Sequence, residues 1–427
     1  MSAPAGGPAA GAGASAGRAP RVALVNLGCR VNRVELDAIA ASLQKAGCEL
    51  VPEPDAEAVV VNTCAVTGEA EAKARKAVRR AAALPQAPVV VATGCVANLF
   101  VDELAELGDR VVVEPIKGLV PARVLGELGW SEGSGTATAG GTPTGRTRPG
   151  VKIQDGCDNR CTYCIVWKAR GAARSLPRNE ALAQVLAEVD AGAHEVVLTG
   201  INLGRYSDGG FGLAELLDEL LERTDGVRYR LSSIEPPEVT PALLSVMGQS
   251  GGMAAPFLHL PVQSGSAGVL KRMGRLYTPA EYLRVVDAAR EAVPGIAVAC
   301  DIIAGFPGET DEEHVESVAL CRRAAFANMH VFRYSRRPGT PAAASPDQVD
   351  PRVIAARASE LRGLARDMRR TYVAARVGQP ELVLVEGGGK GVTGGLVECL
   401  VPDGIREGSL VSVTPHAALP GSLLDAR

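Results

Sequence analysis

The chain has 427 residues, enough for two or three domains with buried cores. Its net charge of −3 gives no global positive field, which argues against non-specific DNA binding. No apolar run reaches transmembrane length, and ten cysteines without a signal peptide indicate a reducing compartment and metal ligation rather than disulfides. We therefore expect a cytoplasmic protein with neither a membrane nor DNA as a partner.

The first 130 residues divide into a tail and a domain. Residues 1–20 are rich in Ala, Gly and Pro and lack both a charged start and an apolar stretch, so they are predicted to be a disordered tail. Over residues 21–130, short apolar runs at 21–27, 58–62, 88–93 and 111–113 alternate with helical patterns. This alternation predicts an α/β domain with a parallel sheet.

A cysteine follows each of the first three predicted strands: Cys29, Cys64 and Cys95. The carboxyl ends of parallel strands meet at one edge of a sheet, so these thiols are expected to lie together there. Three thiolates at one edge favour an iron–sulfur cluster, and the alternative is three separate structural thiols. The helix predicted over 68–83 is basic on one face, which suits either solvent or RNA.

Residues 131–149 are rich in Gly, Thr and Ser and are predicted to link to a second domain at 150–376. Near its start, the sequence DGCDNRCTYC places Cys157, Cys161 and Cys164 at CxxxCxxC spacing. Three soft thiolates on one loop can hold an iron–sulfur cube with one iron left open for a ligand. Zinc is disfavoured because no fourth Cys or His lies between Cys164 and His194, and a disulfide is disfavoured without a secretion signal.

Beyond this loop, strand and helix patterns alternate about six times, which predicts a partial (β/α)6 barrel with its site at the carboxyl ends of the strands. Polar and glycine-rich segments fall at these ends, at 199–204, 232–238, 260–266, 301–310 and 332–342. His259 and His330 fall on strands without a partner at metal-ligand spacing, so they are predicted to be core histidines.

The end of the chain is predicted to hold a helix and a small sheet. Residues 352–376 have the pattern of an arginine-rich amphipathic helix that packs on the barrel and turns its other face to solvent or to tRNA. Residues 377–416 have the length of roughly three to four short strands, which predicts a small antiparallel β-module of the type that binds single-stranded nucleic acid. Residues 417–427 are predicted to be a tail.

Together with the CxxxCxxC loop, the segments LGCRVN, NTCAVT, SGSAGVLKRMGRLYT, DIIAGFPGET and HVFRYSRRPGTPA resemble the radical S-adenosylmethionine (radical-SAM) methylthiotransferases. The resemblance covers nearly all of residues 21–415 and is greatest to members that act on threonylcarbamoyladenosine in tRNA. It implies an N-terminal methylthiotransferase domain, a radical-SAM domain and a short TRAM-like module. The chain departs from the family pattern at Val166-Trp167-Lys168, where an apolar–Pro–Tyr segment is common.

The resemblance also implies two [4Fe–4S] clusters and S-adenosylmethionine as cofactors. Cys157, Cys161 and Cys164 would hold the radical-generating cluster. The auxiliary cluster, which carries the sulfur, would be held by Cys29, Cys64 and Cys95. Tyr163 would lie beside the adenine of S-adenosylmethionine, and the same pocket would include Gly200, Glu235, Gln263, Ser264 and Asp301.

The implied reaction is transfer of a methylthio group to carbon 2 of N6-threonylcarbamoyladenosine next to the anticodon (position 37). One S-adenosylmethionine methylates a sulfur on the auxiliary cluster, and another yields the radical that takes hydrogen from the substrate carbon. The implied partners are the tRNA anticodon loop and an electron donor such as a flavodoxin or ferredoxin. Isopentenyladenosine in tRNA and a ribosomal-protein aspartate remain alternative substrates, and a non-catalytic Fe–S or RNA-binding protein is the competing class.

Overall fold

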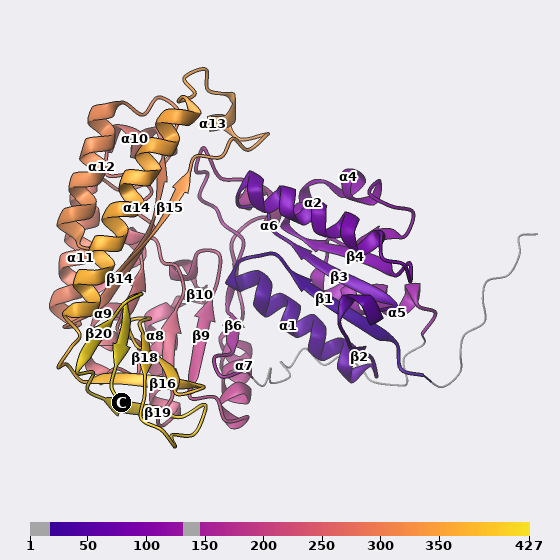
Figure 1. Ribbon diagram of the computed structural model, residues 1–427, viewed down its shortest axis with the longest axis horizontal. Coiled ribbons are helices and arrows are strands. Elements are labelled where there is room, and N and C mark those ends of the chain that lie inside the picture. The colour runs from indigo at the N-terminus through magenta and orange to yellow at the C-terminus, as the bar shows by residue number, and fades with distance from the viewer. Residues whose placement is uncertain (1–17, 131–145) are drawn as a thin grey trace, which may run out of the picture.

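The structure is a computed structural model that describes residues 18–130 and 146–427. Two α/β domains lie side by side, and a C-terminal β-sheet packs at the lower end of the second domain in Figure 1. The predicted tail at 1–20 and the predicted linker at 131–149 fall largely outside the described residues. Among the described residues, no helix has the length and apolar composition that crossing a membrane requires.

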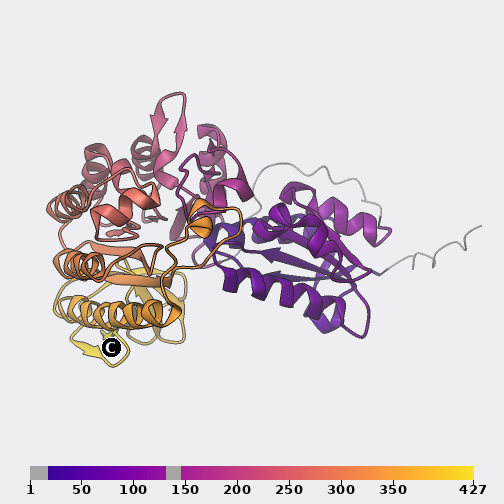
Figure 2. The same ribbon diagram turned by 90° about the horizontal axis from the view of Figure 1, so that it is seen from above.

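The N-terminal domain is built on a parallel sheet with the strand order β2-β1-β3-β4-β5. The central strands β3 (Ala58–Thr63) and β4 (Val89–Gly94) are buried at every residue. Valine-rich runs of this kind form strands where helices cover both faces of a sheet, and Figure 2 shows helices on both sides of this one. The remaining elements are β1 (Arg21–Asn26), β2 (Glu49–Leu50), β5 (Val111–Val113), α1 (Arg30–Lys45), α2 (Gly68–Ala82), α3 (Cys95–Leu99), α4 (Val101–Ala105) and α5 (Val120–Glu127).

The second domain is a partial barrel of six parallel strands in the order β6, β9, β12, β13, β14, β15, as the sequence predicted. Two sheets, β12-β9-β6 and β13-β14-β15, meet through the bridges Tyr229↔Ala254 and Ser233↔His259. One apolar core fills the space between these strands and their helices. The strands are β6 (Gly150–Lys152), β9 (Glu195–Thr199), β12 (Arg228–Leu231), β13 (Phe257–His259), β14 (Ala297–Ala304) and β15 (Asn328–Arg333).

Helices form the outer layer of this barrel and short elements decorate its loops. The longer helices are α7 (Arg178–Asp190), α8 (Leu213–Arg223), α9 (Pro241–Gln249), α11 (Pro279–Ala292), α12 (Asp311–Ala324) and α14 (Pro351–Ala374). The short elements are β7 (Gln154–Asp155), β8 (Arg174–Ser175), β10 (Ser207–Asp208), β11 (Phe211–Gly212), α6 (Val166–Arg170), α10 (Ala267–Met273) and α13 (Pro341–Ala344). Thr278 and Thr310 each begin a helix with a capping box, which fixes where α11 and α12 start.

The C-terminal module is a six-stranded sheet in the order β19-β16-β17-β18-β21-β20. The prediction of a tail at 417–427 is therefore wrong, because β20 and β21 lie in that segment. β21 pairs in parallel with β18, and Leu424 is buried in the core of the module. Tertiary pairing of this kind decides whether such a short segment becomes a strand. The strands are β16 (Glu381–Gly387), β17 (Lys390–Thr393), β18 (Glu398–Leu400), β19 (Leu410–Val413), β20 (Ala417–Leu419) and β21 (Leu423–Asp425).

A buried ion-pair cluster joins the barrel to this sheet. Glu195 on β9 pairs with Arg228 and Arg230 on β12, and all three side chains are fully buried. The two guanidinium groups also donate to backbone carbonyl groups of the C-terminal sheet, at Leu382, Val392, Thr393 and Gly394. Because a buried charge is costly without its partners, the docking of the sheet depends on this cluster.

Candidate active site between the two α/β domains

The CxxxCxxC loop leaves the barrel directly after β7. Gly156, the residue before Cys157, has a φ of +71°, and a Cβ there would lie 1.9 Å from the carbonyl oxygen of Ala172. The backbone N–H of Cys157 donates to the carbonyl oxygen of Gly171 (3.1 Å). Only glycine allows this close approach of two chain segments, so Gly156 fixes the start of the loop.

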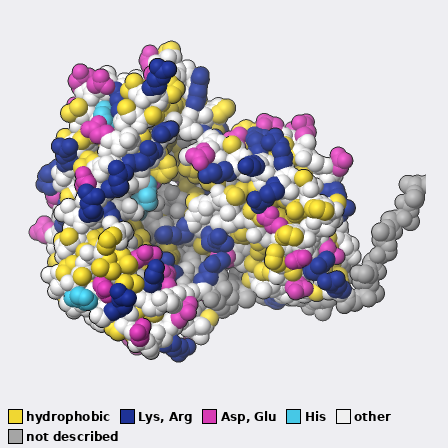
Figure 3. Space-filling view, viewed as in Figure 1, with side chains coloured by type: hydrophobic (Ala, Val, Ile, Leu, Met, Phe, Trp, Pro, Cys, Tyr) yellow, Lys and Arg dark blue, Asp and Glu magenta, His cyan; other side chains and the backbone are white. Residues whose placement is uncertain are grey.

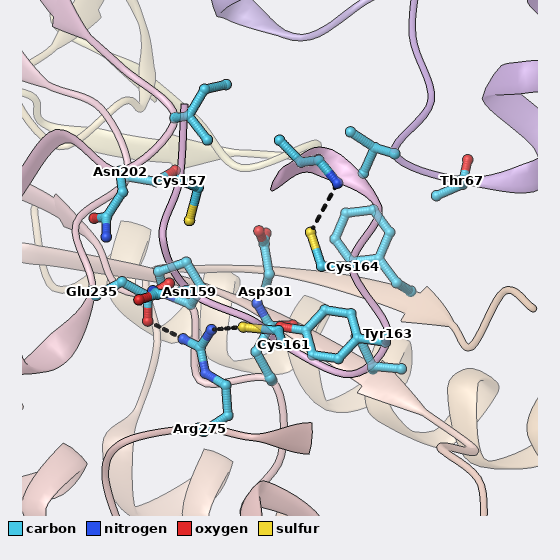
Figure 4. A pocket seen from close by; sticks show the side chains of 18 of the residues that line it. Thr67, Cys157, Asn159, Cys161, Tyr163, Cys164, Asn202, Glu235, Arg275 and Asp301 are labelled. Carbon is cyan, nitrogen blue, oxygen red and sulfur yellow. Dashed lines mark hydrogen bonds and ion pairs between the residues drawn. The ribbon is translucent and has the colours of Figure 1, made fainter. Parts of the chain in front are cut away.

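All three cysteines of the loop line one cavity of about 270 Å³ at the carboxyl ends of the barrel strands. Figure 4 shows Cys157, Cys161 and Cys164 around this space. The N-terminal domain closes its other side with Val66 and Thr67. The cavity is therefore shared by the two α/β domains.

The surroundings of the three sulfur atoms fit an iron–sulfur cluster. Arg275 donates from Nη1 to the sulfur of Cys161 (3.4 Å), and the backbone N–H of Val166 donates to the sulfur of Cys164 (3.4 Å). Burial raises the pKa of the Cys164 thiol to about 12. Positive charge and N–H donors at the sulfurs stabilise bound thiolates. No fourth cysteine and no histidine line the cavity among the described residues, which suits a cluster with one iron left open.

Four of the six residues predicted for the S-adenosylmethionine pocket line this cavity: Tyr163, Glu235, Gln263 and Asp301. Gln263 has a φ of +64°, an unusual conformation for a residue with a side chain and one found often at functional sites. The ring of Tyr163 packs edge-on against Phe306, with ring centroids 6.5 Å apart.

The other two predicted residues, Gly200 and Ser264, lie outside the lining of the cavity. The backbone of Gly200 passes so close to Gln154 that a Cβ would lie 2.9 Å from its side chain. Ser264 is fully buried and its hydroxyl lies 3.2 Å from that of Ser317 on α12. The structure therefore gives both residues a packing role beside the cavity.

Arg275 is the central residue of the site that the sequence did not single out. Its side chain is 3% exposed, forms an ion pair with Glu235 and lies 5.0 Å from the ring centroid of Tyr277. Burial raises the pKa of Glu235, although Arg275 opposes this shift. Nothing in the segment LKRMGRLYT distinguishes this arginine from its neighbours, because its role depends on residues 40 and 114 positions away.

Cys29, Cys64 and Cys95 come together at the edge of the N-terminal sheet, as the sequence predicted. Burial raises the pKa of the Cys64 thiol, and Cys29 and Cys95 lie near enough to raise it further. Cys95 begins α3 after Gly94, whose φ is +94°. Cys29 is exposed, while Cys64 and Cys95 are buried. Val66 and Thr67, two and three residues after Cys64, line the cavity of the CxxxCxxC loop. The triad of Cys29, Cys64 and Cys95 therefore borders the same site.

A buried hydrogen-bond network connects the two cysteine triads through Arg170. Its guanidinium donates to Asn32 (2.8 Å), Glu35 (2.8 Å) and Asp155 (3.0 Å). The carboxamide oxygen of Asn32 also accepts from the thiol of Cys29 (3.4 Å). Asn32 and Glu35 lie on α1, whereas Asp155 and Arg170 flank the CxxxCxxC loop, so the network spans the domain boundary.

The charge of Arg170 also acts on the triad of Cys29, Cys64 and Cys95, through Cys95. Burial lowers the pKa of Arg170, but the neighbouring Cys95 thiol and the two carboxylates outweigh this and raise it. Lys152 adds bonds to Glu35 (2.7 Å) and Asp155 (2.9 Å). This arrangement fixes the position of one cysteine triad relative to the other.

Comparisons with known proteins agree with this architecture. Residues 151–321 match the radical SAM superfamily, and residues 21–113 match the uncharacterized protein family UPF0004. In fold, the chain is similar to the radical S-adenosylmethionine methyltransferase TsrM of Kitasatospora setae, with a TM-score of 0.55 at 16% identity over 76% of this chain and 77% of that one. It is also similar to the cobalamin-dependent radical enzyme OxsB, with a TM-score of 0.52 at 13% identity over 82% and 56% of the two chains.

Relatives of higher identity cover most of the chain. The threonylcarbamoyladenosine tRNA methylthiotransferase MtaB of Bacillus subtilis is 38% identical over 83% of this chain and 82% of its own length. The tRNA-2-methylthio-N(6)-dimethylallyladenosine synthase of Erythrobacter litoralis is 33% identical over 86% of each chain. The ribosomal protein uS12 methylthiotransferase RimO of Desulforudis audaxviator is also 33% identical over 86% of each. The chain thus belongs to the radical-SAM methylthiotransferase family.

Proposed function

We propose that this protein adds a methylthio group to carbon 2 of N6-threonylcarbamoyladenosine at position 37 of tRNA. The observation that carries the proposal is one cavity lined by the CxxxCxxC loop and bordered, through Val66 and Thr67, by the segment that follows Cys64. The Bacillus subtilis relative bears the name of this activity at 38% identity, whereas the dimethylallyladenosine and uS12 relatives stand at 33%.

Two cysteine triads would hold two [4Fe–4S] clusters in this proposal. The radical-generating cluster would bind to Cys157, Cys161 and Cys164, and the auxiliary cluster to Cys29, Cys64 and Cys95. When bound, the first would pass an electron from a donor such as a flavodoxin or ferredoxin to S-adenosylmethionine, and the second would supply sulfur. Radical chemistry suits this substrate because a general base cannot remove hydrogen from the unactivated C–H bond at carbon 2 of adenine.

The residues of the cavity would position S-adenosylmethionine against the open iron. Arg275 links the sulfur of Cys161 to the carboxylate of Glu235, so it holds a positive charge at the loop (Figure 4). Tyr163, Gln263 and Asp301 present an aromatic ring, an amide and a carboxylate to the same space. Aromatic and hydrogen-bonding groups of this kind suit the adenine, ribose and amino-acid parts of the co-substrate. Gly200 and Ser264 would support the pocket by packing behind it.

A basic surface supports tRNA as the macromolecular partner. Arg362, Arg366 and Arg370 of α14 line a groove that residues 418–422 complete. Figure 3 shows a row of Lys and Arg side chains across this part of the surface and more of them around the hollow between the domains. Phosphate groups bind to such arrays, and a base in a single-stranded loop can be splayed into a cavity at low cost. The C-terminal sheet would extend this surface.

The proposal is tested by mass spectrometry of nucleosides from bulk tRNA of cells with and without the gene. Methylthio-threonylcarbamoyladenosine should disappear with the gene and return with the wild-type gene, but not with Cys161→Ala or Cys64→Ala. Cys48→Ala is the matched control, because Cys48 is a buried cysteine in the core of the N-terminal domain. If the dimethylallyl nucleoside changes instead, the substrate is wrong; if no methylthio nucleoside changes, the tRNA assignment is wrong.

A further inference from the structure

A cluster of three side chains in the barrel takes no part in holding either proposed iron–sulfur cluster. His259 on β13, Asp301 on β14 and His330 on β15 lie on neighbouring parallel strands, with Asp301 and His330 directly paired in register. Nε2 of His259 and Nδ1 of His330 each lie 3.1 Å from the same oxygen of Asp301. The prediction that both histidines are core residues is wrong for His330, whose side chain is 53% exposed.

The two histidines are held differently. His259 uses both ring nitrogens, since Nδ1 also lies 2.6 Å from the hydroxyl of Ser233, and its side chain is only 14% exposed. His330 donates to Asp301 from Nδ1 (3.1 Å), and its Nε2 lies 3.2 Å from the carboxamide nitrogen of Asn328. The exposed imidazole of His330 is therefore oriented by Asp301, and its Nε2 can bind a ligand once the side chain of Asn328 gives way.

The charged surroundings of His330 favour its imidazolium form. Burial raises the pKa of Asp301, but the hydrogen bonds from His259 and His330 outweigh it and hold the pKa at about 2, so Asp301 is ionised. Its hydrogen bond to His330 in turn raises the pKa of His330. The ring of His259 packs against His330, with ring centroids 5.8 Å apart. Asn328, which contacts His330, also lines the groove with the α14 arginines Arg362, Arg366, Arg369 and Arg370.

His330 lies beside the cavity of the CxxxCxxC loop, although it is not one of the residues that line it. Asp301 lines that cavity, and so does Phe332, two residues beyond His330 on β15. Side chains two residues apart on a strand point to the same face, about 7 Å from each other. His330 thus lies on the same face as Asp301 and Phe332, one side-chain step beyond the lining of the cavity and further from the cysteine loop.

Two other cations of the cavity are paired with carboxylates. Arg275 is paired with Glu235, and Arg337 is paired with Glu71 of the N-terminal domain. Arg333 lines the cavity and forms no ion pair with the described part of the chain, so no partner fixes its orientation. His330 is also held by a carboxylate, Asp301, but its side chain is 53% exposed, whereas those of Arg275 and Arg337 are 3% and 4% exposed.

The substrate proposed above differs from its close relatives by one negative charge. The threonylcarbamoyl group leaves adenine at N6 and ends in a carboxylate, several bonds from carbon 2, whereas an isopentenyl group carries no charge. A group that binds this carboxylate must therefore lie in or directly beside the same cavity, away from the cysteine loop. We propose that His330, held by Asp301, binds the carboxylate of the threonylcarbamoyl group through Nε2–H; this inference rests on the proposed function. Charge-assisted hydrogen bonds of this kind are the strong ones.

The test compares two anticodon stem–loop RNAs that differ only at position 37, one with threonylcarbamoyladenosine and one with its uncharged amide. Binding is measured with the reconstituted, oxygen-free enzyme in its wild-type, His330→Gln, Arg333→Gln and His194→Gln forms. His194 is an exposed histidine whose ring nitrogen Nδ1 lies 3.4 Å from the backbone oxygen of Gly226. The wild type should prefer the carboxylate RNA by roughly ten- to hundredfold. His330→Gln should bring the ratio close to one with the amide affinity unchanged, and the other two variants should keep it.

The preference should also fall as the pH rises through the raised pKa of His330. The inference is overturned if His330→Gln still prefers the carboxylate RNA over the amide RNA. It is also overturned if Arg333→Gln, rather than His330→Gln, loses this preference. A stoichiometric divalent ion, other than cluster iron, that is present in wild type and lost in His330→Gln also overturns it, because the three side chains would then be metal ligands. If the wild type methylthiolates neither RNA, the proposed function itself fails; if it methylthiolates the carboxylate RNA while His330→Gln keeps the ratio, only this inference fails.

Discussion

Replacing Arg170 by Met should destabilise the protein at the boundary between its two α/β domains. The guanidinium is 1% exposed and bonds to Asn32, Glu35 and Asp155. Its loss leaves two buried carboxylates that retain another cation, since Lys152 lies 2.7 Å from Glu35 and 2.9 Å from Asp155. Breaking a buried ion pair costs about 3–5 kcal/mol, and the remaining cations place this case near 3 kcal/mol.

Arg174→Met is the matched control. Arg174 also bonds to Asp155 (2.8 Å), but its side chain is 61% exposed, so its loss should cost about 0–1 kcal/mol. The free energy of unfolding is measured by urea titration of the reconstituted protein, followed by tryptophan fluorescence. Trp130 packs on the core of the N-terminal domain and Trp167 lies in α6, so the signal reports both sides of the boundary.

Equal destabilisation by Arg170→Met and Arg174→Met would refute the reasoning, since burial would then make no difference to the ion pair. A second consequence concerns coupling between the two cysteine triads. Because Arg170 sets their relative position, Arg170→Met should still cleave S-adenosylmethionine to deoxyadenosine but should form less methylthio product for each molecule cleaved. An unchanged ratio of product to deoxyadenosine would show that the network does not align the two sites.

Gly156→Ala should prevent iron from binding to the CxxxCxxC loop, because the new Cβ would lie 1.9 Å from the carbonyl oxygen of Ala172. Iron analysis of the purified variant checks this. Gly171→Ala is the control and should keep its iron, because Gly171 has a similar φ of +74° but a Cβ there would have no neighbour within 4 Å. Glu195→Gln should lower the free energy of unfolding by about 3–5 kcal/mol, because two buried arginines lose their counter-ion. The control is Glu69→Gln, which changes an exposed glutamate and should leave the midpoint of urea unfolding unchanged. Burial raises the pKa of Glu195, but its arginines lower it further, below the ordinary 4.5. The stabilisation is thus complete above about pH 4.5 and is lost as the pH falls below it, so unfolding free energies measured against pH should decline more steeply in acid for wild type than for Glu195→Gln.

Local spacing and strand order were sufficient to predict the two cysteine triads. Cys157, Cys161 and Cys164 share one short loop, so their proximity follows from chain length alone. Cys29, Cys64 and Cys95 are far apart in sequence, yet each follows a strand of a parallel sheet, and parallel strands bring their carboxyl ends to one edge. The alternation of buried valine runs with amphipathic helices likewise determined both α/β domains, because periodicity reflects which faces are buried.

Contacts between distant segments were decided only by the tertiary structure. Arg275 reaches Cys161 and Glu235, and Arg170 reaches Asn32 across the domain boundary, although neither arginine stands out in its own segment. His330 became an exposed residue beside the cavity because β15 is the edge strand of the barrel.

The segment at 417–427 became two strands because β18 offered β21 an unpaired edge. Sequence patterns thus determined which residues are buried and where the strands end, since both depend on neighbours along the chain. Pairing between side chains depends on distances that only the folded chain sets, and so the partners of Arg170, Arg275 and His330 could not be predicted from the sequence.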